Sequence, residues 1–210
     1  MNKTRRTIVY IDGFNFYHAI DDLRKEHLKW VNLWSLSESL LKPDQSLVAV
    51  KYFSAYARWK PAHYRRHRQY TAALEAKGVT VTMSEFKERR TGCNKCGATW
   101  TKHEEKESDV FLATDIVADL YNDRFDVAIV ITADSDIRPA IQHVIDTKGK
   151  FVLVVSPPNR FANARSLNPA MSITKGRIAK HLLEPSVTNS SGDVIATRPT
   201  RYNPPPRTSS

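Results

Sequence analysis

Five aspartates lie at or close to the ends of apolar segments, where an α/β domain holds its ligand. They are Asp12, Asp109, Asp115, Asp134 and Asp136. Two continuous apolar runs, residues 7–11 and 127–131, each end just before acids of this set. In an open α/β sheet the ligand crevice lies outside the carboxyl ends of the strands, so strands that end in acid bring carboxylates together.

Gathered carboxylates repel one another unless a hard cation neutralises them, and Mg²⁺ or Mn²⁺ prefers such oxygen ligands. The whole chain carries the opposite charge, because 32 Lys and Arg residues against 22 Asp and Glu residues give a net charge of +10. A basic surface attracts nucleic acid through its phosphates. The sequence therefore predicts a metal-dependent enzyme that acts on a polyanion.

Strand and helix patterns alternate along the chain. We expect helices at residues 15–24, 32–41, 61–77, 109–121, 136–148 and 178–183, and strands at residues 8–11, 47–54, 79–83, 126–132 and 150–155. Strands that alternate with helices of this length indicate βαβ units around a central, mainly parallel sheet. The predicted fold class is α/β.

Composition divides the 210 residues into one domain and a tail. We expect the domain to cover residues 1–184, with a polar, Cys-containing insertion at 85–106 that forms a loop or a hairpin. Residues 185–210 are rich in Pro, Ser, Thr, Asn and Arg, which predicts an extended or disordered tail. No apolar run approaches the roughly 20 residues that span a bilayer, and no apolar leader follows the N-terminus. We expect a cytoplasmic protein with no membrane partner.

Three motifs resemble the signatures of one family. They are IDGFN at residues 11–15, KESDVFLATD at residues 106–115, and ITADSD at residues 131–136, followed by Pro139. In order, spacing and strand context, residues 7–183 resemble the NYN domain, the LabA-like branch of the PIN-like nuclease superfamily. Ala133 and Ile137 depart from the family pattern, which has Gly and Phe there, but neither departure removes a carboxylate.

The resemblance implies a three-layer PIN-like, Rossmann-like fold and an Mg²⁺- or Mn²⁺-dependent ribonuclease. Carried over residue by residue, the metal and catalytic positions are Asp12, Asp109, Asp115 and Asp134, supported by Asp136 and Asn15. Taken singly, these residues have simpler interpretations. Asp12 before Gly13 is typical of a turn, and Asp134 and Asn15 are typical helix caps.

Helix geometry separates two of these acids. Asp109 and Asp115 are six residues apart, so on one continuous helix they point about 120° away from each other. Both reach one metal cluster only if Asp109 lies at the start of the helix or in the loop before it. We therefore rank Asp12, Asp115 and Asp134 above Asp109.

Basic and aromatic side chains alternate between residues 56 and 70. Arg and Lys can neutralise phosphates there, and an aromatic ring can stack on an unpaired base. The alternative is an amphipathic helix with Tyr64 and Tyr70 in the core and a solvated basic face. The position after the second predicted strand favours nucleic-acid contact, by Arg58, Trp59, Lys60, Tyr64, Arg65, Arg66 and Arg68.

Cys93 and Cys96 are the two cysteines of the chain, in a C-x-x-C spacing. With His103 they offer three ligands where structural zinc takes four, so Glu104, Glu105 or a residue of a second subunit in a homodimer could complete the site. A metal-free thiol pair is the alternative.

The predicted function is hydrolysis of phosphodiester bonds in single-stranded or structured RNA. One alternative is a non-catalytic NYN module that binds RNA or a protein. A second is a nucleotide-sugar transferase with a DxD metal motif at Asp134 and Asp136, which leaves Asp109 and Asp115 unexplained. The sequence does not determine the number of catalytic metals or the preference for RNA over DNA.

Overall fold

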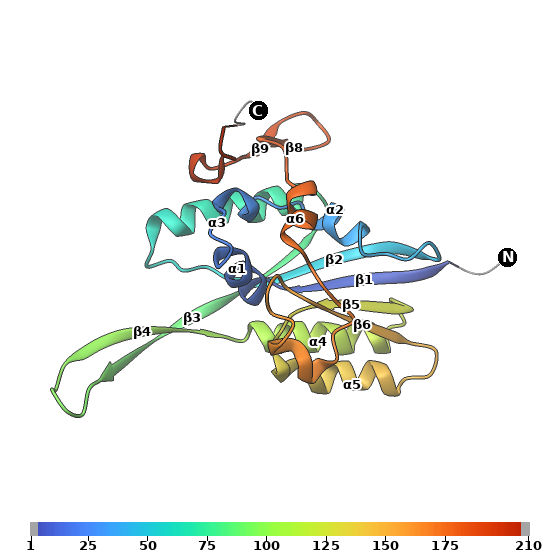
Figure 1. Cartoon of the computed structure of the whole chain (residues 1–210), viewed down its shortest axis with the longest axis horizontal. Coiled ribbons are helices and arrows are strands. Elements are labelled where there is room, and N and C mark those ends of the chain that lie inside the picture. The colour runs from blue at the N-terminus through green and yellow to red at the C-terminus, as the bar shows by residue number, and fades with distance from the viewer. Residues whose placement is uncertain (1–3, 207–210) are drawn as a thin grey trace.

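The computed structural model of the chain describes residues 4–206, and these form a three-layer α/β fold around one sheet (Figure 1). The sheet order is β4-β3-β2-β1-β5-β6-β7, and every pair is parallel except β3–β4. The strands are β1 (Arg5–Asp12), β2 (Gln45–Ala55), β3 (Thr80–Gly92), β4 (Thr99–Lys106), β5 (Val127–Ile131), β6 (Phe151–Ser156) and β7 (Met171–Ser172). The predicted fold class is confirmed.

Helices cover both faces of the sheet (Figure 1). One layer holds α1 (Gly13–Asp21), α2 (Leu33–Glu38), α3 (Pro61–Ala76) and α6 (Lys175–Lys180). The other layer holds α4 (Ser108–Tyr121) and α5 (Arg138–Asp146). Local sequence explains two of the helix starts. The Asn32 side chain caps α2 by accepting a hydrogen bond from the Ser35 amide (3.1 Å), and Pro61 occupies the first turn of α3.

Alternation along β1 assigns each side chain to one of the two cores. Val9 and Ile11 belong to the core under α1 and α3, whereas Ile8 and Tyr10 belong to the core under α4 and α5. Because successive strand residues point to opposite faces, Asp12 follows Ile8 and Tyr10 onto the α4 side. It does so at the carboxyl end of the strand, where the ligand edge of the sheet lies.

The predicted insertion is a hairpin. β3 runs on past its parallel pairing with β2 and pairs with β4 in antiparallel register, from Glu85 opposite Lys106 to Gly92 opposite Thr99. We call this paired segment the hairpin arm, and it extends away from the body of the domain (Figure 1). Glu107, with φ of 79°, makes the sharp turn from the arm into α4.

The C-terminal segment differs from our expectation of an extended or disordered tail. β8 (Ser186–Thr188) and β9 (Val194–Thr197) form a small antiparallel hairpin that is followed by the 3-10 turn η4 (Thr200–Tyr202). Val187, Ala196 and Tyr202 are buried in the same core as α1 and α3. These few apolar side chains are enough to hold a segment whose average composition is polar; residues 207–210 lie outside the described part.

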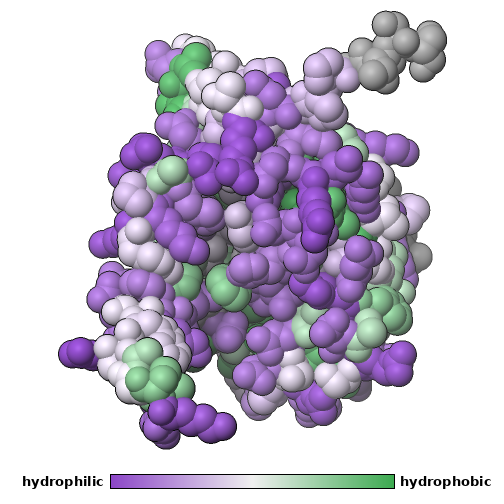
Figure 2. Space-filling view, turned by 60° about the vertical axis from the view of Figure 1, so that its left-hand side comes forward, coloured by the Kyte–Doolittle hydropathy of each residue, from purple (hydrophilic) through white to green (hydrophobic). Residues whose placement is uncertain are grey.

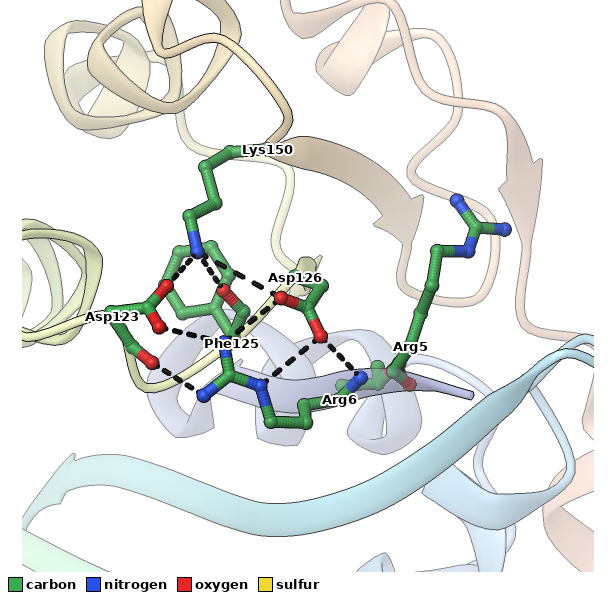
Figure 3. Close-up of polar contacts among 7 residues, drawn as sticks. Arg5, Arg6, Asp123, Phe125, Asp126 and Lys150 are labelled. Carbon is green, nitrogen blue, oxygen red and sulfur yellow. Dashed lines mark hydrogen bonds and ion pairs between the residues drawn. The ribbon is translucent and has the colours of Figure 1, made fainter. Parts of the chain in front are cut away.

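A network of ion pairs closes the opposite edge of the sheet, where β1, β5 and β6 begin (Figure 3). The Arg6 guanidinium contacts Asp126 (2.9 Å) and Asp123 (3.1 Å), and Lys150 contacts the same two carboxylates. Hydrogen bonds from Arg6 hold the pKa of Asp126 well below its ordinary value. Each of these two acids therefore has basic side chains beside it.

None of the helices described in residues 4–206 has the length and apolar character that a membrane crossing requires.

Candidate active site

Asp12 is held rigidly at the end of β1. Its carboxylate accepts hydrogen bonds from the Asn15 amide (2.9 Å) and the Thr132 hydroxyl (2.8 Å), and the residue is only 4% exposed. Burial raises the pKa of Asp12 to about 7, with a smaller contribution from the charges of Asp109 and Glu105 and against the two hydrogen bonds that lower it. Asp12, and not Asn15, thus caps α1, and it is at the same time a buried carboxylate among other acids.

Close packing explains the glycine that follows. A Cβ atom on Gly13 would lie 2.5 Å from the Tyr52 ring and 2.6 Å from the Phe53 carbonyl oxygen, far inside van der Waals contact. The chain therefore needs glycine here because β2 passes so near, and this contact fixes the direction in which α1 leaves Asp12.

Thr132 links Asp12 to the acids after β5. Its hydroxyl donates to Asp12 and accepts a hydrogen bond from the Asp134 amide (3.0 Å). The Asp134 carboxylate in turn accepts a hydrogen bond from the Asp136 amide (3.0 Å), which caps the 3-10 turn η2 (Ser135–Ile137). Asp134 is half-buried and Asp136 is exposed, so the chain of contacts runs from the interior out to solvent.

Asp109 joins these acids from the start of α4. It is the second residue of the helix, directly after the turn at Glu107. Partial burial of its carboxyl group raises the pKa of Asp109, and the charges of Asp134 and Asp136 raise it further. This position at the helix start meets the condition under which the helical phase allows Asp109 to reach the other acids.

Glu105 is a member of the cluster that the sequence assigned elsewhere. It lies on β4 at the base of the hairpin arm, opposite Phe86, and its carboxylate is 3.4 Å from the Ser84 hydroxyl. Burial raises the pKa of Glu105, and the charge of Asp109 adds to the effect. From the sequence, Glu105 is only a possible zinc ligand. Its spacing of four residues before Asp109 is the one signal that points here.

We name Asp12, Glu105, Asp109, Asp134 and Asp136 the acid cluster. Within residues 4–206, none of the five forms an ion pair with Lys, Arg or His, in contrast to the acids of the opposite edge (Figure 3). Uncompensated carboxylates, among which Asp12, Glu105 and Asp109 have raised pKa values, fit a hard cation with oxygen ligands. In the described part of the chain, however, no three His, Cys, Asp or Glu side chains converge closely enough to hold one ion.

The structure does not bring Asp115 into the acid cluster. Its carboxylate contacts Lys51 (2.9 Å), which also contacts Asp119 (2.7 Å), and Asp119 accepts a hydrogen bond from the Tyr10 hydroxyl (2.7 Å). Tyr10 precedes Asp12 by two residues on the same face of β1, so this network lies deeper along the strand. Our ranking of Asp115 above Asp109 is corrected, because α4 carries the two acids to different depths of the domain.

The expected nucleic-acid contacts fall into two groups. Arg58, Trp59 and Lys60 lie in the loop between the carboxyl end of β2 and α3, and Trp59 packs against Phe86 of β3. A second group on α3 lines a wide hollow of about 630 Å³ together with β9 and the segment after it, and comprises Tyr64, Arg65, Arg66 and Arg68. Arg65 and Arg68 are exposed, and Tyr70 is buried as the amphipathic alternative had it.

The cysteines lie at the tip of the hairpin arm without His103. The Cys93 amide donates to the Ala98 carbonyl (2.8 Å), and the Gly97 amide donates to the Cys93 carbonyl (2.9 Å). The amides of Cys96 and Lys95 lower the pKa of the Cys93 thiol. In the β3–β4 register His103 lies opposite Glu88, four residues along β4 from Thr99 at the tip end of the paired strands. Four strand residues span about 13 Å, so His103 lies far from the two cysteines. The expected ligand set of Cys93, Cys96 and His103 is therefore wrong.

The sheet order, the two helical layers and the acids at the carboxyl ends of the strands define a PIN-like α/β domain. A family model described as the NYN domain matches residues 6–171, and the chain belongs to this family. NYN domains are members of the PIN-like nuclease superfamily.

Two further comparisons found a relative and a solved structure that are similar to this chain, and the name of neither describes a nuclease. The chain is 29% identical over 198 residues to 6-hydroxy-3-succinoylpyridine 3-monooxygenase HspA of Pseudomonas putida (strain DSM 28022 / S16). That match covers 75% of this chain and 62% of the relative, so the chain spans less than two thirds of that protein. A solved structure of VPA0982, a protein of unknown function from Vibrio parahaemolyticus RIMD 2210633, matches with a TM-score of 0.53. It is 17% identical and covers 87% of this chain and 99% of its own, which shows the shared fold.

Proposed function

We propose that this protein is a divalent-metal-dependent ribonuclease and that the acid cluster is its catalytic centre. The observation that carries the proposal is the acid cluster at the ligand edge of an NYN domain, whose five carboxylates pair with no Lys, Arg or His within residues 4–206. A protein that only bound RNA would gain nothing from unpaired carboxylates beside a polyanion, since they repel its phosphates.

Asp12, Asp109 and Asp134 would have to approach one another more closely than they do in residues 4–206 of this structure to hold Mg²⁺ or Mn²⁺, with Asp136 and Glu105 at the margin. When bound, such an ion supplies a Lewis acid that activates water and screens the scissile phosphate. The chain contributes orientation. Hydrogen bonds from Asn15 and Thr132 fix the Asp12 carboxylate, while Asp109 and Asp134 reach the same edge from the starts of α4 and η2.

Asp115 has a different role in this proposal. Its ion pair with Lys51, shared with Asp119, joins α4 to β2 beneath the acid cluster. This ion pair would fix the position of α4 relative to β2, and so the position of Asp109 in the first turn of α4.

Asn15 would support the site in two ways. Its backbone amide donates to the Asp12 carboxylate, and its side-chain oxygen is enclosed and receives no hydrogen bond within residues 4–206.

Cleavage assays test the proposed activity. With labelled single-stranded RNA, we expect the full chain to cleave in Mg²⁺ or Mn²⁺ and to stop in excess EDTA, with activity restored by adding the ion back. The same assay on DNA of equal sequence determines the sugar preference. Binding without cleavage in either ion would reject the enzyme in favour of a non-catalytic NYN module. Cleavage of nucleotide sugars instead would favour the DxD transferase.

We propose that Arg65 and Arg68 contact the RNA backbone. Replacing both with Ala should weaken RNA binding and make its salt dependence shallower, by about 0.7 in the slope for each phosphate that the protein no longer neutralises. The matched control replaces two exposed lysines, Lys25 and Lys148, and so removes the same charge elsewhere. Titration of affinity against salt measures both. Equal slopes for the two double variants would make the α3 arginines a solvated face.

We propose that Cys93 and Cys96 form a zinc knuckle at the tip of the arm. Two thiolates fill half of a tetrahedral site, so two knuckles from two copies of the chain would complete it. We expect about half a zinc ion per chain by elemental analysis, and a dimer by light scattering that the double Cys→Ser variant abolishes together with the zinc. A zinc-free monomer that cleaves RNA normally would leave the cysteines without this role.

A further inference from the structure

An aromatic groove lies beside the acid cluster. It is a hollow of about 350 Å³ between α1, the loop before α3 and the base of the hairpin arm, and its aromatic walls include Phe14, Trp59, Phe86 and His103. The Trp59 and His103 rings are stacked in parallel, with centroids 3.7 Å apart and planes 5° apart. Phe86 meets the Trp59 ring edge-on at 4.6 Å, so the rings support one another in fixed positions.

The groove walls are not part of the hydrophobic core. Phe14 is 40% exposed, and Trp59, Phe86 and His103 are half-buried. Figure 2 shows the face that the arm projects from as mainly hydrophilic, with hydrophobic residues showing in a hollow. Exposed rings gathered in a preformed hollow are typical of a ligand site, since core packing would cover them.

Three ring nitrogens in this region are buried without a partner in the described part of the chain. They are the Nδ1 atoms of His63, His67 and His103, all of which line the groove, and none of them makes a hydrogen bond within residues 4–206. His103 Nδ1 is 3.7 Å from the Glu88 carboxylate, too far for a hydrogen bond. Buried polar atoms usually have partners, so three that lack one beside aromatic rings indicate a ligand that has ring donors or acceptors of its own.

The groove and the acid cluster share a wall. Phe14 follows Asp12 by two residues, and Ser54, which lines the groove, follows Phe53, the residue opposite Asp12 on β2. The Ser84 hydroxyl donates to the Ser54 carbonyl (3.2 Å) and also faces the Glu105 carboxylate (3.4 Å). A molecule in the groove is therefore next to the carboxylates.

We propose that the aromatic groove receives one unpaired base of the RNA strand whose phosphate lies at the acid cluster. The proposal rests on the ribonuclease function and names the part of the substrate that the site selects. A flat heterocycle fits the stacked rings, and Lys60 in the groove lining and Arg58 beside Trp59 can neutralise the adjoining phosphates. A base inside a duplex has both faces covered and cannot enter, so the groove selects single-stranded RNA.

Binding assays with abasic RNA test this inference in the full chain. The probe is a fluorescently labelled RNA octamer, intact or with one abasic position moved along the strand, measured by anisotropy in EDTA to prevent cleavage. We expect Trp59→Ala to weaken binding of the intact octamer about tenfold. Trp100→Ala is the matched control, because Trp100 is 50% exposed on the arm and does not line the groove.

For the unmodified protein, one position of the abasic site should weaken octamer binding as much as Trp59→Ala weakens binding of the intact octamer. With that abasic octamer, Trp59→Ala should cause no further loss of affinity. Phe86→Leu keeps apolar volume and should show the same pattern if Trp59→Ala misfolds. Equal binding of all abasic octamers, or equal losses for the two tryptophan variants, would overturn the inference. So would Trp59-dependent binding of free 2-hydroxypyridine with unchanged RNA binding, which would indicate a small heteroaromatic ligand.

The outcomes separate this inference from the proposed activity. Base-dependent binding at Trp59 without cleavage in Mg²⁺ or Mn²⁺ would reject the nuclease and keep the groove. Cleavage with unaltered affinity in Trp59→Ala would reject the groove and keep the nuclease.

Discussion

Asp12→Asn is expected to reduce metal-dependent RNA cleavage by about 100-fold or more while the domain stays folded. Asparagine keeps the shape of the side chain and an oxygen that can still accept from the Asn15 amide. It removes the charge, and with it the repulsion from Asp109 and Glu105, so the metal-free domain should be no less stable. What disappears is the oxygen ligand set. Cleavage rates and the rise in melting temperature on adding Mn²⁺ measure the two effects.

Two further variants serve as comparisons for Asp12→Asn: Asp146→Asn as a control, and Asp115→Asn as a test of the ion pair with Lys51. Asp146 is an exposed acid on α5, so its variant should behave like the unmodified protein. Asp115→Asn weakens the contact with Lys51, so a lower melting temperature is expected, together with more residual cleavage than in Asp12→Asn. If Asp12→Asn cleaves at the normal rate, the catalytic centre is not at the end of β1. If Asp115→Asn is the more severe variant, Asp115 returns to the metal site.

Gly13→Ala is expected to lower the free energy of unfolding by about 3 kcal/mol or more, at the upper end of overpacking effects. The added methyl would meet the Tyr52 ring at 2.5 Å and the Phe53 carbonyl at 2.6 Å. The carbonyl belongs to a central strand and cannot rotate away, so either β1 or α1 must move. For a domain of this size the melting temperature should fall by about 6 to 12 °C.

Gly176→Ala is the matched control for this prediction. Gly176 lies in α6, where an added Cβ would meet its nearest atom, the Thr174 hydroxyl, only at 4.0 Å. Alanine also favours helix over glycine, so this variant should be neutral or slightly stabilising. Thermal melts of both variants give the comparison. A Gly13→Ala protein as stable as the control would mean that β2 does not press on the start of α1.

The periodicity of the apolar residues predicted most of the fold, and the acids that follow the strands predicted part of the candidate site. The apolar runs before Asp12 and Asp134 are buried strands beside each other in the sheet, because a continuous apolar run has no other stable place in an α/β domain. The helical phase of Asp109 against Asp115 was also readable. The sequence could not show which of the two faces the site, because that depends on where α4 starts, and a left-handed turn at Glu107 determines it.

The remaining differences come from contacts between distant segments. Glu105 and His103 group with the cysteines in the sequence because they are close along the chain, yet the pairing of β3 with β4 places them at the base of the arm and the cysteines at its tip. The segment after residue 185 reads as a tail because its average is polar. Its folded structure depends on a few apolar side chains that pack against the core near α3. An average composition does not reveal such individual contacts.

The C-terminal hairpin also sets an order of events during synthesis. Its Tyr202 is buried in the core that α1 and α3 share, Trp30 donates to the Glu184 carbonyl (2.8 Å), and Arg201 contacts Glu26 (3.1 Å). We therefore expect this apolar surface of the first half of the chain to stay uncovered until residue 202 has left the ribosome. Chains stalled short of that point would present the surface to chaperones and to one another.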